Sequence, residues 1–289
     1  MADSHPILLF LGTLAYLAAL GVTLFRVLHR HPPVHALNFL LILGGWLLQS
    51  GGLYFRGIEA GCCPVRNLFE IFQFVSWSVV LVYLITGQVF RLSLFGTTSA
   101  TLAALLSAVA FLLPGIDETP SVSLLGASPW IEAHAAIAVF SYGIFGLLSA
   151  LSALYLLQNH SLKAKRFNGI FRFLPSIMEM DTLLFRLLLT ACLVFTSAVA
   201  IGAVYWVGHP EQVGTWKFLT TVTLWLAYLI VLLLRLRNVL YGTRLATLSI
   251  FLFVAALLTL WPVEANRDRS GLSTIEGPGP GPLVLRDVA

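Results

Sequence analysis

The stretch WIEAHAAIAVFSYGIFGLLSALSALYLLQ, residues 130–158, decides the fold class of this chain. It is apolar on every side of a helix and exceeds the roughly 20 helical residues that cross a 30 Å hydrocarbon core. Glu132 and His134 stand near its beginning. We therefore predict a membrane-spanning helix that carries two polar groups close to one membrane surface.

The rest of the chain has a similar composition. Its 289 residues are 58% hydrophobic and 10% charged, with a mean hydropathy of +0.89, whereas a soluble domain has about 25% charged residues. The apolar runs lack the alternation that membrane β-strands show. We predict an all-α, polytopic integral membrane helix bundle of about eight transmembrane helices. Their expected ranges are 7–27, 35–55, 67–88, 96–114, 130–158, 181–206, 215–234 and 245–262.

Residues 1–263 are predicted to form one membrane domain, because no soluble block of domain size interrupts the helices. The leader MADSHP carries Asp3 and no Lys or Arg, which favours an anchor over a cleaved signal peptide. The segment 264–289 contains a Gly-Pro repeat, which cannot build a packed core, so we expect a disordered tail. The inner loop 159–180 is basic and rich in Phe, as in an interfacial segment.

The distribution of Lys and Arg predicts the orientation, because positively charged loops stay in the cytoplasm. One alternating set of loops holds ten of these residues, and the opposite set holds six. Both termini are therefore predicted outside the cell's inner (plasma) membrane. The net charge of +4 is spread without a dense basic run, so we expect membrane lipid and no nucleic acid as partner. The ten are Arg26, Arg30, Arg91, Lys163, Lys165, Arg166, Arg172, Arg235, Arg237 and Arg244; the six are Arg56, Arg66, Lys217, Arg267, Arg269 and Arg286.

Two histidines are predicted at the outer surface. His134 lies about one turn inside its helix, and Trp130 precedes it by four residues on the same helical face. The outer loop VYWVGHPEQVGTWKF places His209 on the same side of the membrane, between Trp206 and Trp216. Two neutral imidazoles among aromatic rings are suited to ligating the iron of a flat, apolar cofactor such as haem.

A simpler interpretation stays open for these histidines. His134 is then an interfacial side chain bonded to a neighbour, and His209 is a solvated loop residue. Three more histidines lie in the inner loop HRHPPVH, residues 29–35, where a solvated turn is a simpler interpretation than a metal site.

The third predicted helix begins with CCPVRNLFEIFQFVSW, residues 62–77, and carries Glu70, Gln73 and Trp77 on one face. A carboxyl group inside a membrane is costly enough to require a partner or a water-filled cavity. One interpretation is a polar chamber that opens outward, with Arg66 or Lys217 as the partner. The other is a buried hydrogen bond between helices.

The three cysteines and one further pair of charged residues are the remaining candidates for a functional role. Cys62 and Cys63 are adjacent and would close a strained disulfide ring, which leaves soft-metal binding, thiol exchange or a packing role. Cys192 is alone within a helix. Asp181 and Arg186 are interpreted as a capping acid and a snorkelling arginine. The absence of a Walker loop or a G-x-S-x-G pattern leaves nucleotide-driven and hydrolytic functions without support.

Three stretches together resemble the cytochrome c assembly family of haem-handling membrane proteins, which includes CcsA-like and ResC-like members. The resemblance runs in order over about residues 64–262, and the short outer loop resembles most the small HemX-like and YpjD-like branch. The stretches are the quoted segments at 62–77 and 130–158, and MDTLLFRLLLTACLVFTSAVAIGAVYW at 180–206 followed by GTWKFLTTVTLWLAYLIVLLLR.

This resemblance implies a haem site on the outer side. His134 corresponds to the family's external haem ligand, so it is expected to ligate the iron of haem b, with His209 as a weaker second candidate. Lys217 aligns with a lysine of the family's outer motif, but Thr215 and Trp216 stand where that motif has Asp-Pro. The expected cofactor-binding residues are His134, His209, Trp130, Trp206, Trp216 and Glu70.

The implied function is haem binding or handling in cytochrome c biogenesis, within a membrane complex of maturation proteins and without an enzymatic activity of its own. A HemX-like regulator of tetrapyrrole biosynthesis, docking a partner on loop 159–180, is an alternative. A soft-metal or small-solute transporter that uses Cys62 and Cys63 is another. Haem uptake distinguishes the first function from the other two.

Overall fold

The computed structural model describes residues 4–29, 35–90, 93–113, 129–164, 176–208 and 215–272. Within these ranges the chain forms eight α-helices and no strands, which confirms the predicted fold class. Each helix begins within a few residues of its predicted start. The helices are α1 (Ser4–Leu28), α2 (His35–Ala60), α3 (Leu68–Phe90), α4 (Ser93–Leu112), α5 (Pro129–Lys163), α6 (Ile177–Gly208), α7 (Thr215–Leu236) and α8 (Thr243–Leu272).

The helices have the length and composition of membrane spans. Among the residues described, α1 to α7 provide seven segments long and apolar enough to cross a membrane. The described apolar part of α8, Thr243–Leu258, is shorter. Large apolar side chains such as Leu28 and Val204 point outward, at 70% and 75% exposure, as expected of surfaces that contact lipid. The chain is therefore a multi-pass membrane protein.

The predicted boundary between membrane domain and tail at residue 263 falls within α8 and stays a prediction. The helix α8 continues to Leu272. Residues 273–289 lie outside the described part of the chain, so the disordered tail stays a prediction. The segment RFNGIFRFLP of the inner loop, residues 166–175, also lies outside it.

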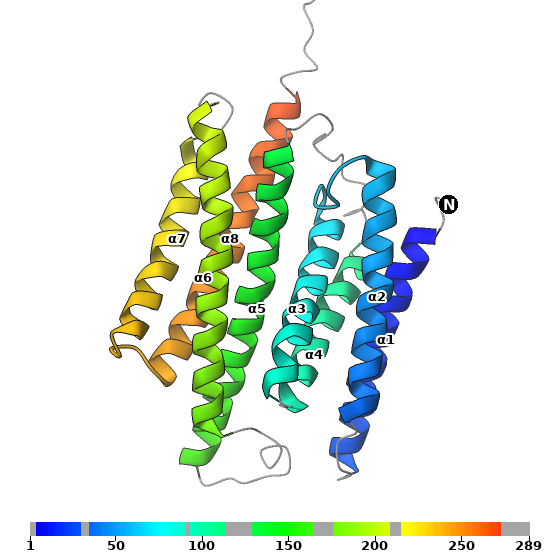
Figure 1. The fold of residues 1–289 in the computed structure, drawn as a ribbon, viewed down its shortest axis with the longest axis vertical. Helices are drawn as coiled ribbons and strands as arrows, with labels where there is room; N and C mark the ends of the chain where they lie inside the picture. Colours follow the sequence, from blue (N-terminus) through cyan, green and yellow to red (C-terminus); the bar gives the residue numbers. More distant parts are fainter. Residues whose placement is uncertain are drawn as a thin grey trace, which may run out of the picture.

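The helices run side by side, with α1 to α4 on one side of the bundle and α5 to α8 on the other (Figure 1). The long helix α5 joins the two halves, because it packs against α6 and α8 and also against α3. The α2–α3 turn, the beginning of α5 and the end of α6 all lie at the end of the bundle that is at the top of Figure 1. We call this the upper end of the bundle; the α7–α8 turn lies at the lower end.

A close helix crossing fixes α5 against α3. A Cβ atom added at Gly143 would lie 1.7 Å from Oγ of Ser78 and 3.1 Å from the carbonyl oxygen of Val75. Only glycine permits this approach of the two backbones, as is common where membrane helices pack closely. This crossing holds the middle of α5 against α3.

The α2–α3 turn begins with a glycine helix terminus. Gly61 has φ of 65°, in the left-handed region that favours glycine. Its N–H donates to the carbonyl of Ile58 (3.2 Å), and the N–H of Cys62 donates to that of Gly57 (3.3 Å). These two bonds form a Schellman motif, which turns the chain sharply into the loop before α3.

At the lower end, α6 begins earlier than predicted. Ser176 and Glu179 exchange side-chain to backbone hydrogen bonds of 3.2 and 3.0 Å, a capping box. The interpretation of Asp181 as the capping acid is therefore wrong. Its carboxylate pairs with Arg235 of α7 and accepts the N–H of Gly242 at 2.9 Å. Asp181 thus fastens α6 to the α7–α8 turn.

Candidate functional site

His134 lies in the second turn of α5 at the upper end of the bundle, and it is half-buried. Its Nδ1 atom lies 2.7 Å from the carbonyl oxygen of Ala198 on α6. A carbonyl only accepts hydrogen bonds, so the neutral imidazole carries its proton on Nδ1 and keeps a lone pair on Nε2. Nε2 has no hydrogen-bond partner within the described residues. This is the tautomer that coordinates a metal through Nε2.

Gly202 provides the space in which this imidazole sits. A Cβ atom at position 202 would lie 2.7 Å from Cε1 and 2.8 Å from Nδ1 of His134. Real Cβ atoms essentially never come within 3.0 Å of such an atom. The imidazole can therefore reach Ala198 only because α6 has a glycine one turn later. Gly202 was not among the residues predicted for the site.

Two tryptophans lie further out on the same two helices. Trp130 precedes His134 by four residues on α5, and Trp206 follows Gly202 by four residues on α6, so each lies about one helical turn, roughly 6 Å, nearer the upper end. Trp130 is 65% exposed. Trp206 stacks on Phe218 of α7, with ring centroids 4.6 Å apart. Both tryptophans therefore lie nearer the upper end of the bundle than His134 does.

The predicted site residues between α6 and the beginning of α7 are not described. His209 lies outside the described residues, and Trp216 begins α7 with a side chain that also lies outside them. The same holds for the side chain of Lys217. Their roles stay predictions.

The α2–α3 turn contacts the first turn of α5. The backbone N–H of Cys63 donates to Oε2 of Glu132 at 3.1 Å. Burial raises the pKa of the Cys63 thiol to about 11, and the Glu132 carboxylate adds to the rise; burial also raises the pKa of Cys62. All three cysteines are unpaired thiols. Raised pKa values disfavour the thiolate that thiol exchange and soft-metal binding require.

The described part of the chain contains no cluster of side chains suited to binding a metal ion directly. No three His, Cys, Asp or Glu side chains there come close enough to hold a metal ion. In the first inner loop, Nδ1 of His29 lies 2.9 Å from the carbonyl of Phe25, and the two rings stack. Direct protein metal sites at Cys62 and Cys63 or at His29 therefore have no support from these residues.

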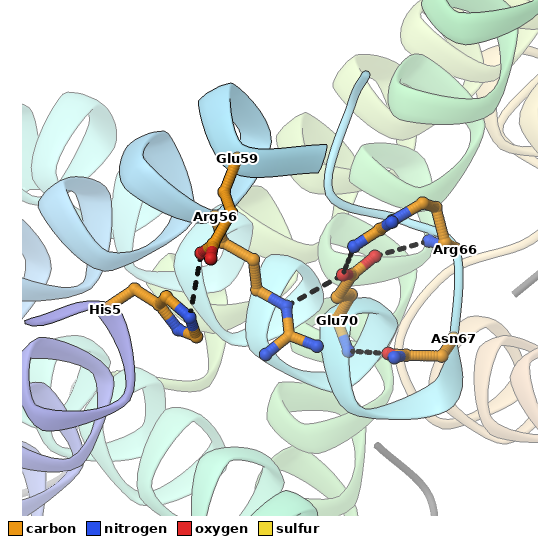
Figure 2. Close-up of polar contacts among 6 residues, drawn as sticks. All are labelled: His5, Arg56, Glu59, Arg66, Asn67 and Glu70. Atoms are coloured by element: carbon orange, nitrogen blue, oxygen red, sulfur yellow. Dashed lines mark hydrogen bonds and ion pairs between the residues drawn. The ribbon is translucent and has the colours of Figure 1, made fainter. Parts of the chain in front are cut away.

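Glu70 is the centre of a buried charge cluster at the upper end (Figure 2). It is fully buried. Its Oε1 accepts Nε of Arg56 at 2.7 Å and Nη2 of Arg66 at 2.9 Å, and its Oε2 accepts the Arg66 N–H at 2.6 Å. The side chain of Asn67 caps α3 by accepting the Glu70 N–H at 2.8 Å. Arg66 is thus the partner that the sequence predicted, whereas Arg56 was missed.

The polar face predicted for α3 is packed against α2. Besides the Glu70–Arg56 pair, Oε1 of Gln73 accepts Nε2 of Gln49 at 2.7 Å, and Nε1 of Trp77 donates to Ser50 at 2.7 Å. Each of the three predicted residues on this face therefore has a polar partner on α2. This arrangement supports the interpretation of buried hydrogen bonds between helices, and it leaves Glu70 without contact with solvent.

Comparison with known proteins identifies the family. Residues 65–266 match the family described as Cytochrome C assembly protein. This range begins in the turn before α3 and continues into α8, so it includes Arg66, Glu70, His134 and Gly202, whereas Arg56 lies before it. The chain belongs to the cytochrome c assembly protein family, as its sequence motifs indicated.

Particular relatives come from several bacteria and an alga. Protein HemX of Brevibacillus brevis is 29% identical over 180 residues, which are 62% of this chain and 65% of HemX. Protein NrfI of Wolinella succinogenes is 29% identical over 273 residues, 90% of this chain but 28% of NrfI. Cytochrome c biogenesis protein CcsA of Cyanidium caldarium is 24% identical over 283 residues, 83% of this chain and 93% of CcsA. The chain thus spans less than two thirds of HemX and of NrfI.

Proposed function

We propose that this protein binds haem at the upper end of the bundle and serves cytochrome c biogenesis there. The observation that carries the proposal is the hydrogen bond between Nδ1 of His134 and the carbonyl oxygen of Ala198, which leaves the lone pair of Nε2 available for a metal. Membership of the cytochrome c assembly family and the relative named as a cytochrome c biogenesis protein support the pathway.

The residues present fit haem. His134 offers a neutral Nε2 in a fixed orientation, and bound haem supplies an iron that accepts this lone pair. Trp130 and Trp206 offer aromatic surface toward the membrane boundary, where a flat apolar ring system is stabilised by burial and stacking. His209 is proposed as the second ligand, with Trp216 beside the macrocycle. Haem b is the proposed form, because the sequence has no C-x-x-C-H attachment motif.

The role of the protein in this proposal is to hold and orient haem. Ala198 and Gly202 keep the imidazole from rotating, which lowers the entropic cost of ligation. The lipid-facing helices keep the site at a fixed depth. Partner proteins of cytochrome c maturation would receive or supply the haem, and no bond-making step is assigned to this chain.

The upper end is proposed to face the outside of the plasma membrane, with both termini on that side. The basic residues at the lower end include Arg237 and Arg244, which are both exposed. Of the six basic residues assigned to the opposite side, Arg56 and Arg66 are both paired with Glu70. Their contribution to the charge of the upper surface is therefore reduced, which strengthens the positive-inside argument.

An absorption spectrum of the purified protein tests haem binding. Protein extracted in mild detergent and supplied with haemin should show a Soret band, and His134→Ala should lose most of it. His134→Gly with added imidazole should regain part of the band, because the vacated space admits the free ligand. His160→Ala, in the last turn of the same helix, is the matched control and should behave as wild type.

Three outcomes would redirect the assignment. An unchanged Soret band in His134→Ala would remove this residue from the site. A wild-type protein that takes up no haem would favour the regulatory function instead, which capture of a soluble enzyme of tetrapyrrole synthesis on loop 159–180 would then support. Metal-dependent transport lost in Cys62→Ser, Cys63→Ser would favour the transporter.

A further inference from the structure

The turn between α7 and α8, at the lower end of the bundle, lies where two apolar segments end. The apolar part of α7 ends at Leu236, and that of α8 begins at Thr243. A segment that crosses a membrane ends near the level of the lipid headgroups. Residues 237–242 are therefore expected at this level, on one surface of the membrane.

This turn has a defined conformation. Asn238 has φ of 55°, in the left-handed region. Leu240 is 7% exposed and belongs to the largest buried cluster of the protein. Nη1 of Arg235 donates to the carbonyl of Leu240 at 3.3 Å, and Asp181 accepts the N–H of Gly242 at 2.9 Å. The side chains that the turn presents outward are thereby held in place.

The outward side chains are both apolar and basic. Val239 and Tyr241, on either side of the buried Leu240, are 55% and 64% exposed. Arg237 and Arg244 flank them and are also exposed. Apolar side chains next to arginines are typical of a protein surface in the headgroup region, where the apolar groups reach the acyl chains and the guanidinium groups reach the phosphates.

The two exposed arginines have no anionic partner in the described part of the chain. Asp181 is paired with Arg235, and Glu179 accepts the N–H of Ser176 in the capping box of α6. The sequence 163–175, which links α5 to α6, has four basic residues and no acidic one. The described acidic groups at this end are therefore engaged elsewhere.

The turn lies at a different depth from the ends of its neighbours. A Cβ atom added at Gly242 would lie 3.1 Å from Oη of Tyr155, so the turn is level with Tyr155 of α5. From there α5 continues for eight residues to Lys163, about 12 Å further. Figure 1 shows the lower ends of α5 and α6 extending past the turn. The turn is thus at headgroup level, whereas the end of α5 projects beyond it toward water.

We propose that Arg237 and Arg244 bind the phosphate of an anionic lipid, with Val239 and Tyr241 inserted beside its acyl chains. A guanidinium group donates two parallel hydrogen bonds to phosphate oxygens. The adjoining apolar side chains favour a lipid over a soluble anion, which offers them no partner. Anionic lipids of the cytoplasmic leaflet also agree with the orientation proposed above. This inference is independent of haem binding.

The first test compares phosphatidylglycerol with phosphatidylcholine, which has no net charge. Native mass spectrometry of the full-length protein, released from mixed micelles, measures the dissociation constant of each lipid. Arg237→Gln and Arg244→Gln should each weaken phosphatidylglycerol binding about fivefold, the contribution expected of one basic residue at a membrane surface. Binding of phosphatidylcholine should stay unchanged. Lys163→Gln removes a positive charge from the projecting end of α5 and is the matched control, expected to bind both lipids as the wild type does.

The second test locates the lipid without removing an arginine. Tyr241→Trp adds an indole at the turn, and its emission is taken as the difference from the wild type. Phosphatidylglycerol with brominated acyl chains should quench this added emission more strongly than brominated phosphatidylcholine at the same mole fraction. Equal quenching by the two lipids would contradict a preference for the anionic one at this turn.

Three other results would overturn the inference. One is an unchanged preference for phosphatidylglycerol when both arginines are replaced by glutamine. Another is an equal loss in Lys163→Gln, which would assign the preference to the general charge of the lower end. The third is displacement of phosphatidylglycerol by inorganic phosphate at a similar concentration, which would assign the two arginines to a soluble anion.

Discussion

Replacing Gly202 by alanine tests how the imidazole of His134 is held. The added methyl group would lie 2.7 Å from Cε1, and ordinary contact begins at 3.4 Å, so the ring must move by about 0.7 Å or α6 must shift. The Nδ1–Ala198 hydrogen bond is 2.7 Å long in the structure, and such a movement would lengthen or misalign it. Overpacking costs about 1–3 kcal/mol, and loss of the hydrogen bond costs about 1 kcal/mol.

Haem affinity should respond more clearly than stability. Loss of a group that orients a metal-ligating histidine typically lowers metal affinity about 10- to 100-fold, so Gly202→Ala should raise the dissociation constant for haemin by that range. Soret titration of the purified variant measures it. Gly208→Ala is the matched control, since a Cβ at this position on the same helix meets nothing within 4 Å.

A double-variant cycle shows whether the two positions act together. If Gly202 acts through His134, then adding Gly202→Ala to His134→Ala should change haem affinity little further. Wild-type affinity in Gly202→Ala, or full additivity of the two losses, would refute the reasoning.

Three further predictions concern other parts of the bundle. Gly143→Ala should lower the midpoint of thermal unfolding in detergent, by the equivalent of about 1–3 kcal/mol. Adding Ser78→Gly should restore part of this loss, because the added methyl group clashes with Ser78. An unchanged midpoint in Gly143→Ala would contradict the close crossing of α3 and α5. Alkylation of Cys63 in a Cys62→Ser background should keep accelerating from pH 8 to pH 10, because a thiol with a pKa of about 11 is protonated over that range; a plateau near pH 9 would argue against the buried turn. Asp181→Asn should destabilise the protein by about 2 kcal/mol through loss of the Arg235 pair, and equal stability of variant and wild type would remove this tie from the fold.

The number and order of the helices were predictable because each contains a continuous apolar run, and seven of these runs are long enough to cross a membrane. The Glu70–Arg66 pair was also predictable, since the two residues are four apart at the beginning of one helix. The tautomer of His134 was not, because its partner is a backbone carbonyl 64 residues away.

The pairings between helices could not be predicted for a physical reason. A soluble helix shows an apolar stripe that reveals its buried face, whereas a membrane helix is apolar all round. The sequence pattern therefore does not indicate which face of α2 or α6 packs against its neighbours. For this reason the Arg56–Glu70 and Asp181–Arg235 pairs were not predicted. Gly202 was overlooked for the same reason, since its role depends on which face of α6 meets His134.

A structure of the haem-loaded protein would test the central claim most directly, because it shows which atom the iron contacts. We predict iron bound to Nε2 of His134, with the Nδ1 hydrogen bond to Ala198 retained as it stands at 2.7 Å. Iron bound through Nδ1, or haem bound away from the junction of α5 and α6, would contradict it.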